Sequence, residues 1–269
     1  MNVFCCPVCG LLMEKSGGAL YCKNGHAFDI SRKGYVNLYI HGNKGIHGDD
    51  KTMLNARSAF LDKGYYAPLQ EFLLKQVQQI TNSSLKVLDL GCADGYYLSA
   101  FKAIPGAELI GIDISKYAVC AAKRRVPEMH AAVASCSMLP LESAGMDVVI
   151  SVFAPVKDME LKRILKPDGR VFMVLPGPNH LYELKQAVYQ NAYLNPLPKP
   201  GLKGFNVCSK QCLSYKMDLS QQDDILNLFM MTPYYYRSSP RDKKKLSKIN
   251  KLSVTAEFYI FCLEHERKD

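Results

Sequence analysis

The sequence lacks any long apolar run. No stretch approaches the length of a membrane-spanning helix, and the opening MNVFCCPVCG has neither a basic start with an apolar segment behind it nor a cleavage site. These absences argue against a membrane or secreted protein, so we expect a cytoplasmic one. Repeats and low-complexity tracts are absent too, and 48% of the 269 residues are hydrophobic. We therefore expect one large domain, or one medium domain plus a small module.

A disulfide framework is also disfavoured, because thiols are kept reduced in the cytoplasm. The chain nevertheless has a cluster of soft ligands near its start, spaced Cys-x₂-Cys-x₁₂-Cys-x₃-His. Its members are Cys6, Cys9, Cys22 and His26. Two close pairs separated by a loop are how a short chain surrounds a tetrahedral zinc ion, and four protein ligands make a closed, structural site. Cys5 is an alternative to Cys6, but the x₂ spacing favours Cys6. A redox Cys-x-x-Cys normally follows a strand and opens a helix, and no such unit is visible here.

Acidic residues are fewer than basic ones, 25 against 34, and the net charge is +9. The basic residues gather in AAKRRV, in RDKKKLSKINK and in the region 32–51. Such a run is often only a solvated face. Three separate runs with tyrosines between them favour a nucleic-acid partner.

The chain divides into three parts by pattern. We expect a zinc-binding module with a role in RNA recognition at 1–38, a glycine-rich linker at 39–52 and a catalytic domain at 53–269. Apolar residues spaced by three and four predict helices from Met53 and from Ala67. From residue 85, five apolar segments alternate with helical ones, at the spacing of a parallel sheet. Two later segments, 205–217 and 251–265, predict an antiparallel pair, so the expected fold is α/β with a mostly parallel seven-stranded sheet.

The strongest chemical pattern is VLDLGCADGYYLSAF, which begins at Val87. An apolar strand leads into Gly91 and Gly95, and a helix follows, so backbone N–H groups are free to meet a ligand. The acidic Asp89 suits an amino-acid ammonium group better than a diphosphate. Asp113 ends the next strand, where its carboxylate would accept hydrogen bonds from both ribose hydroxyls. Together they predict an S-adenosylmethionine site; a turn without a ligand is the alternative.

From about 85 to 263 the chain resembles the class I methyltransferases. It departs from their commonest form at Ala93, where a glycine is usual, and we expect a negative φ there. With the zinc module included, the chain is similar to the RlmA family. The motifs CPVCG, CKNGHAFDISRKGYVNL, ARSAFLDKGYYAPL, VLDLGCADGYY, FAPV, PGPNHLYELK and MTPYYYR carry this likeness along nearly the whole chain.

The RlmA resemblance implies methyl transfer to N1 of a guanine in a hairpin of 23S rRNA. It also implies that Tyr66 and His180 lie in the cofactor pocket beside Gly95 and Tyr96. Without the resemblance, Tyr66 reads as a packing aromatic and His180 as a residue at a helix N-terminus. The MTPYYYR run is a candidate for stacking an unpaired base, with Arg237 on a phosphate, or else a strand-end aromatic cluster.

No residue stands out as the catalytic base. His180 is a candidate because histidine titrates near neutrality, and Asp158 is another, with a helix-start carboxylate as its alternative. Phe153 follows the fourth strand, where it could stack the target base or serve as a core aromatic. Two rival functions stay open: a methyltransferase of a small molecule, and a zinc-containing RNA-binding protein without activity. A homodimer is left open as well.

Overall fold

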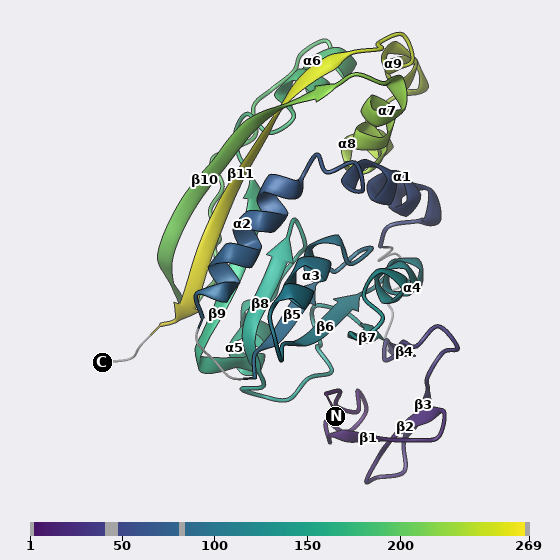
Figure 1. Ribbon diagram of the computed structural model, residues 1–269, viewed down its shortest axis with the longest axis vertical. Helices are drawn as coiled ribbons and strands as arrows, with labels where there is room; N and C mark the ends of the chain where they lie inside the picture. Colours follow the sequence, from purple (N-terminus) through teal and green to yellow (C-terminus); the bar gives the residue numbers. More distant parts are fainter. Residues whose placement is uncertain (1–2, 41–47, 81–83, 267–269) are drawn as a thin grey trace.

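The computed structural model describes residues 3–40, 48–80 and 84–266. An eight-stranded sheet forms its centre, in the order β10-β11-β9-β8-β5-β6-β7-β4 (Figure 1). Its five central strands are parallel, namely β5 (Lys86–Leu90), β6 (Glu108–Asp113), β7 (His130–Val133), β8 (Met146–Val152) and β9 (Leu165–Pro176). β10 (Phe205–Leu219) and β11 (Leu252–His265) complete one edge in antiparallel pairing. The five parallel strands and the antiparallel pair are as predicted.

One strand more than expected is present. β4 (Val36–Asn37) pairs in parallel with β7 at the other edge of the large sheet. The sheet therefore has eight strands among the described residues, and the prediction of seven was short by this two-residue strand. This pairing places Val36 and Asn37, near the end of the region 1–38, in the large sheet. A two-residue strand leaves almost no periodicity in a sequence, so its pairing partner alone defines it.

The first residues form a separate small sheet of three strands, β1 (Met13–Ser16), β2 (Ala19–Cys22) and β3 (Ala27–Asp29). This module does not have a core of its own. Its buried side chains, including Phe4, Cys6 and Met13, pack in the same cluster as Leu88 of β5 and Leu161 of α5 (Asp158–Ile164). The module is therefore fastened to the larger domain by shared apolar burial.

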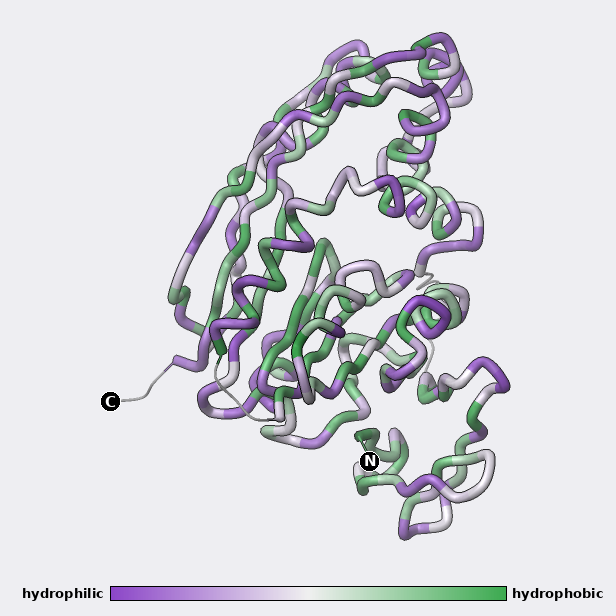
Figure 2. The backbone as a smooth tube through the Cα atoms, viewed as in Figure 1, coloured by the Kyte–Doolittle hydropathy of each residue, from purple (hydrophilic) through white to green (hydrophobic). Residues whose placement is uncertain are grey.

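Helices cover both faces of the large sheet. Alternate residues of a strand point to opposite faces, so Val148 and Ile150 of β8 pack in one cluster and Val149 packs in the other. The first face is covered by α2 (Ala67–Gln78), α3 (Tyr96–Ala100), α4 (Lys116–Arg125), α6 (Tyr182–Val188) and α7 (Gln222–Met230). The second is covered by α5 and the zinc module. Figure 2 shows the apolar central strands between more polar outer segments.

The helix predicted from Met53 begins two residues earlier. The side chain of Asp50 accepts a hydrogen bond from the backbone N–H of Met53 at 2.8 Å and so caps α1 (Lys51–Leu61). The expected linker 39–52 thus overlaps the start of α1, and its residues 41–47 lie outside the described part of the chain. After α1, Gly64 has a positive φ of 79° and turns the chain into α2, as its position suggested.

The MTPYYYR run is helical. Tyr234–Arg237 form the short α8, which precedes α9 (Pro240–Leu246), so the strand-end alternative is wrong. The Tyr236 hydroxyl donates to Asp50 at 2.7 Å, and Lys243 Nζ lies 3.7 Å from the centre of the Tyr235 ring. The stacking of an unpaired RNA base on this run stays a prediction.

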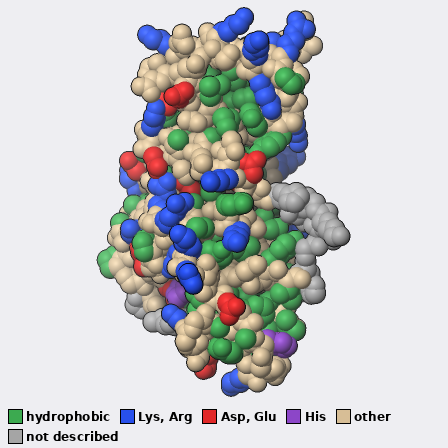
Figure 3. Space-filling model, turned by 90° about the vertical axis from the view of Figure 1, so that its right-hand side faces the viewer, with side chains coloured by type: hydrophobic (Ala, Val, Ile, Leu, Met, Phe, Trp, Pro, Cys, Tyr) green, Lys and Arg blue, Asp and Glu red, His purple; other side chains and the backbone are tan. Residues whose placement is uncertain are grey.

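Basic side chains gather on the face that carries α4 and α9. The basic residues of these helices are Lys116, Lys123, Arg124, Arg125, Arg241, Lys243, Lys244 and Lys245. Figure 3 shows Lys and Arg side chains along the top edge of this face and in a band across its middle, with fewer acidic ones. Two of the three basic runs thus lie on helices of the described structure; residues 41–47 of the third lie outside it.

Candidate functional site

The four predicted metal ligands come together. The ligand atoms of Cys6, Cys9, Cys22 and His26 all lie within 4.8 Å of one another. Nδ1 of His26 is 3.5 Å from Sγ of Cys6 and 3.3 Å from Sγ of Cys22, and the sulfurs of Cys9 and Cys22 are 3.6 Å apart. A tetrahedral zinc ion with its usual bond lengths separates two sulfurs by about 3.8 Å and a sulfur from a nitrogen by about 3.5 Å. The cluster therefore fits zinc with Cys6 and not Cys5 as the first ligand.

The thiol of Cys22 is readily deprotonated to a thiolate. Burial raises the pKa of its thiol, but hydrogen bonds from the backbone of His26 and Asn24, and from neighbouring Cys9 and His26 side chains, lower it to about 6. Thiolates are the form that binds zinc.

The zinc module is hydrogen-bonded to the larger domain beside these ligands. The backbone N–H of Cys5 donates to the carbonyl of Pro140 at 2.9 Å, and Phe4 forms an isolated antiparallel bridge with Leu141. Residues 139–141 follow, after one intervening residue, on Ser135–Ser137, which line the larger of the two cavities described below. The attachment point of the zinc module and part of the cavity wall therefore lie on one short segment of the chain.

The glycine turn leads from β5 to α3 and approaches its neighbours closely. Gly91 has a φ of 78°, and a Cβ there would lie 2.5 Å from the Cβ of Ala154. Gly95 has a φ of 76°, and a Cβ there would meet Ala122 of α4 at 3.0 Å. A side chain at either position would be strained and would clash with a packed residue. Both glycines are thus required for the turn to lie against β8 and α4.

Ala93 differs from the expectation. Its φ is +46°, so the prediction of a negative φ is wrong. The reason is a hydrogen bond at 3.0 Å from the Ala93 N–H to the carboxylate of Asp113, which holds the turn in this conformation. The other oxygen of Asp113 accepts from the Ser115 N–H at 2.8 Å. A left-handed alanine costs about 1–2 kcal/mol, which this anchoring offsets.

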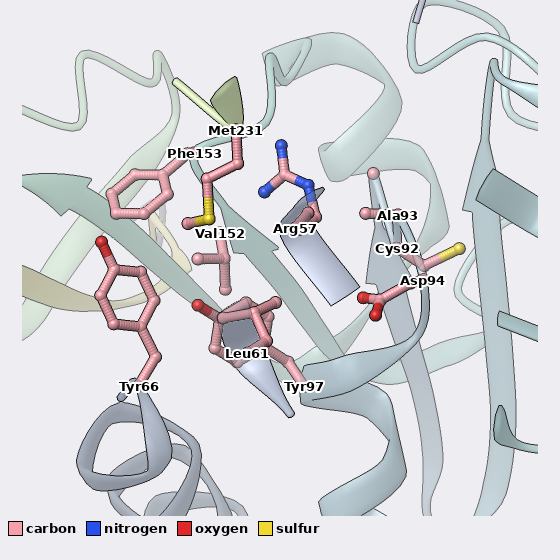
Figure 4. Close-up of a pocket in the computed structure, with 11 residues that line it drawn as sticks. Arg57, Leu61, Tyr66, Cys92, Ala93, Asp94, Tyr97, Val152, Phe153 and Met231 are labelled. Atoms are coloured by element: carbon pink, nitrogen blue, oxygen red, sulfur yellow. The ribbon is translucent and has the colours of Figure 1, made fainter. Parts of the chain in front are cut away.

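Two adjoining cavities open at the carboxyl ends of the parallel strands. The larger, of about 440 Å³, is lined by residues that include Asp113, Ile112 and Ser135. The smaller, of about 30 Å³, is lined by residues that include Tyr66 and Tyr97 (Figure 4). The residues that line both are Arg57, Gly91, Ala93, Val152 and Phe153. Together they are large enough for a nucleoside with an attached amino-acid chain.

Asp89 lies beneath the turn. Its side chain is buried, and Oδ2 has no hydrogen-bond partner among the described residues. Burial, followed by the charges of Asp113 and Asp94, raises the pKa of Asp89 to about 7. A buried acceptor without a partner suits a positively charged group. Asp89 is not among the described residues that line either cavity, so its contact with the ammonium group stays a prediction.

Of the remaining predicted residues, Tyr66 lines a cavity and Gly95 and Tyr96 do not. Tyr66 is buried and lines the smaller cavity. Gly95 and Tyr96 belong to the turn and to α3, but in the described structure they are not among the residues that line either cavity. The Tyr96 ring instead lies under the guanidinium of Arg125 at 5.8 Å. The next residue, Tyr97, lines the smaller cavity in its place.

His180 lies behind the cavities, in an aromatic cluster. Its ring centre is 5.5 Å from that of Phe153, 5.0 Å from that of Phe258 and 6.3 Å from that of Tyr66. Nδ1 accepts a hydrogen bond from the backbone N–H of Glu257 at 3.2 Å. Burial, and then the charge of Lys185, lowers the pKa of His180 to about 3. The imidazole is therefore neutral with its proton on Nε2, which makes it a donor and disfavours it as a base.

Phe153 and Asp158 follow β8. Phe153 is 39% exposed, lines both cavities and has a φ of +57°, which is rare for a residue with a bulky side chain. Asp158 is the first residue of α5, where its carboxylate accepts from the Met159 N–H at 3.0 Å. This is the helix-start arrangement, and among the described residues Asp158 is not part of either cavity wall.

The sequence did not identify Arg57, Tyr97 or Met231 as site residues. All three line the smaller cavity (Figure 4). They come from α1, α3 and the end of α7. Tyr97 and Met231 lie within the motifs VLDLGCADGYYLSAF and MTPYYYR, whose spacing does not distinguish them from their neighbours, and Arg57 lies in an ordinary helical pattern. The motif ARSAFL, which contains Arg57, was noticed only as part of a family likeness.

Comparison with known proteins agrees with both parts of the structure. Residues 4–40 match the N-terminal zinc-ribbon domain of RlmA, and residues 87–169 match a methyltransferase domain. A 23S rRNA (guanine(748)-N(1))-methyltransferase of Streptomyces fradiae is 37% identical over 187 residues, 68% of this chain and 66% of that protein. YxjB of Bacillus subtilis (strain 168), provisionally named a 23S rRNA (guanine-N(1)-)-methyltransferase, is 32% identical over 264 residues, 92% of this chain and 91% of that protein.

Among solved structures, the YcgJ protein from Bacillus subtilis is similar with a TM-score of 0.49 and 14% identity, over 74% of this chain and 98% of that chain. The strand order and the glycine turn define a class I methyltransferase that uses S-adenosylmethionine. With the zinc ribbon in front of it, the chain belongs to the RlmA family of methyltransferases.

Proposed function

We propose that the protein transfers a methyl group from S-adenosylmethionine to N1 of a guanine in a hairpin loop of 23S rRNA. The observation that carries this proposal is the zinc ribbon attached at Pro140 and Leu141, on the segment that follows the cavity-lining residues Ser135–Ser137, in a chain whose relatives carry the names of such enzymes. A small-molecule methyltransferase has no need of this module. The basic faces of α4 and α9 supply the charge that RNA phosphates require.

A guanine in a loop is the substrate that this site suits. N1 of a paired guanine is occupied by its Watson–Crick partner, whereas an unpaired base is turned out of the stack at small cost. Phe153 lies at the junction of the two cavities, where its partly exposed ring offers a surface for the base. The ring would hold N1 in line with the methyl group and the sulfonium sulfur.

Positioning then supplies most of the rate enhancement. S-adenosylmethionine provides the electrophilic methyl group. N1 of guanine would lose its proton to solvent, and the electron pair left on N1 would form the bond to the methyl carbon. The S–C bond would break onto sulfur and give S-adenosylhomocysteine. Since His180 keeps its proton on Nε2, we assign it a hydrogen-bonding role behind Phe153 rather than the role of base.

The test uses unmodified 23S rRNA transcripts, the purified zinc-loaded protein and labelled S-adenosylmethionine. Primer extension then maps the label, because a methyl group at N1 blocks pairing and stops reverse transcriptase. We expect one stop within a hairpin loop, and a weaker one with Asp113→Ala at limiting S-adenosylmethionine. Label at N2 or on a ribose hydroxyl would overturn the proposed chemistry, and label only on small molecules would overturn the RNA substrate.

The proposed substrate places the enzyme in the cytoplasm. None of the helices in the described parts of the chain has both the length and the apolar character needed to cross a bilayer. The homodimer left open by the sequence stays a prediction, and sedimentation of the protein with and without RNA measures it.

A further inference from the structure

Arg57 is a cation at the junction of the two cavities. It belongs to α1, and its side chain lines both the larger cavity and the smaller one. Figure 4 shows its guanidinium between Met231 and Phe153 on one side and Ala93 on the other. Of the described residues that line both cavities, it is the one with a positive charge. Whatever binds there lies close to this guanidinium.

The guanidinium is oriented but only partly paired. Nε donates to Asp49 Oδ2 at 2.9 Å, and Asp49 is in turn held by a hydrogen bond of 2.8 Å from Ser115 Oγ to its carbonyl. Neither terminal nitrogen of Arg57 has a hydrogen-bond partner among the described residues. The side chain is only 20% exposed. Burial lowers the pKa of Arg57, but the charge of Asp49 and its hydrogen bond contribute to a net rise in the pKa, so the guanidinium stays charged. A fork of N–H donors is thus presented to the cavity.

The carboxylates nearby have other partners. Asp94 accepts from Ser58 Oγ at 2.8 Å and from Arg125 at 2.7 Å. Asp113 accepts from two backbone N–H groups and lies in the larger cavity. Among the described residues only Asp49 forms an ion pair with Arg57, and it accepts from one donor, Nε. The two terminal nitrogens therefore have N–H donors that no described residue accepts, and an anionic ligand could accept them.

S-adenosylmethionine brings such an anion. It carries a sulfonium and an ammonium group, both positive, and one carboxylate. A sulfonium can accept no hydrogen bond from the terminal nitrogens of Arg57, whereas a carboxylate suits the planar fork and is bound by it in a bidentate way. The same carboxylate would be repelled by Asp89 and Asp94 if it lay against the turn. Charge thus separates the two ends of the amino acid: the ammonium toward the acidic turn, where Asp94 lines the smaller cavity and Asp89 lies beneath, and the carboxylate toward Arg57.

We propose that Arg57 binds the carboxylate of the methionine moiety of S-adenosylmethionine and thereby positions the methyl group at Phe153. The inference rests on the methyl donor and not on the identity of the RNA, so it is tested without RNA. The alternative role, contact with guanine O6, would leave cofactor binding unchanged.

The test compares two ligands by titration calorimetry on the full, zinc-loaded chain. S-adenosylhomocysteine has the amino-acid end, and 5′-methylthioadenosine lacks it. Arg57→Gln should weaken binding of S-adenosylhomocysteine by about 10- to 100-fold, the loss of a charged hydrogen-bond pair. Binding of methylthioadenosine should change by less than about twofold, because the adenosine contacts remain. Arg57→Lys, which keeps the charge without the fork, should fall between.

The matched control is Arg170→Gln. Arg170 pairs with Glu264 at 2.9 Å on β9 and β11, and it is not among the described residues that line the cavities, so both ligands should bind this variant as they bind the wild type. Equal loss of both ligands in the Arg57 variants would show that Arg57 supports the adenosine site or the fold, and would overturn the proposal. No loss of either would also overturn it and assign Arg57 to the RNA. If Arg57→Gln does not fold, the test uses Arg57→Lys. A larger loss of affinity for S-adenosylhomocysteine than for methylthioadenosine supports the proposal, and equal losses overturn it.

Discussion

The buried carboxyl of Asp89 makes a testable link between stability and pH. Only 2% of the residue is exposed, and Oδ2 has no hydrogen-bond partner among the described residues. Burial is the first cause that raises its pKa from 3.8 to about 7, and the charges of Asp113 and Asp94 add to it. The replacement Asp89→Asn removes the charge while it keeps the size and shape of the side chain.

The sign of the effect follows from the direction of the shift. Because the pKa is higher in the folded protein than in the unfolded chain, Asp89 stabilises the fold below about pH 4, and this contribution is lost as the pH rises through about 7. A shift of one unit corresponds to 1.36 kcal/mol, so the whole effect is on the order of 4 kcal/mol. Between pH 5 and pH 8 the loss amounts to about 2–3 kcal/mol.

The assay is urea unfolding of the cofactor-free protein at pH 5 and pH 8. Between these pH values, Asp89→Asn should gain about 2–3 kcal/mol in free energy of unfolding relative to the wild type, since it lacks the penalty for a buried charge. Effects of pH on the zinc site are common to both proteins and cancel in this difference. The control Asp168→Asn, at an exposed position of β9, should follow the wild type. The same pH profile for Asp89→Asn and the wild type would refute the reasoning.

Two further predictions concern the other parts of the site. Asp113→Ala should weaken binding of S-adenosylmethionine by about 1.5–3 kcal/mol through loss of the ribose contact, as calorimetry would measure; unchanged affinity would place the ribose elsewhere. Cys9→Ser should reduce zinc from about one ion per chain to none and expose the N-terminal region to proteases, as metal analysis and limited proteolysis would show. A metal-free protein with an intact N-terminal fold would contradict the structural role of the metal.

The features predictable from the sequence are those with a local cause. The zinc ligands follow from spacing, and the turn at Gly91 and Gly95 follows from glycines between an apolar strand and a helix. The φ of Ala93 was predicted with the wrong sign, because it depends on the Asp113 carboxylate 20 residues away. β4 was missed because two residues show no periodicity, and only the pairing with β7 reveals them.

The candidate site was harder to predict where burial decides the chemistry. His180 was a candidate base because histidine ordinarily titrates near neutrality, yet its buried setting lowers the pKa to about 3 and occupies Nδ1. Arg57 sits 34 residues before Gly91 in an unremarkable helix, and nothing local indicates that α1 brings it to the turn. Such residues depend on tertiary contacts that no short pattern records.

The attachment of the zinc module at Pro140 and Leu141 has a geometric consequence for substrate choice. Since the module shares its apolar packing with β5 and α5, it is held in place against the larger domain. The module and Phe153 are therefore held at a fixed separation. If the module contacts the RNA, as we predict, only a nucleotide at the matching distance along the RNA fold would reach Phe153 and the methyl group. The position that is modified would then be selected by the shape of the hairpin as much as by the identity of its bases.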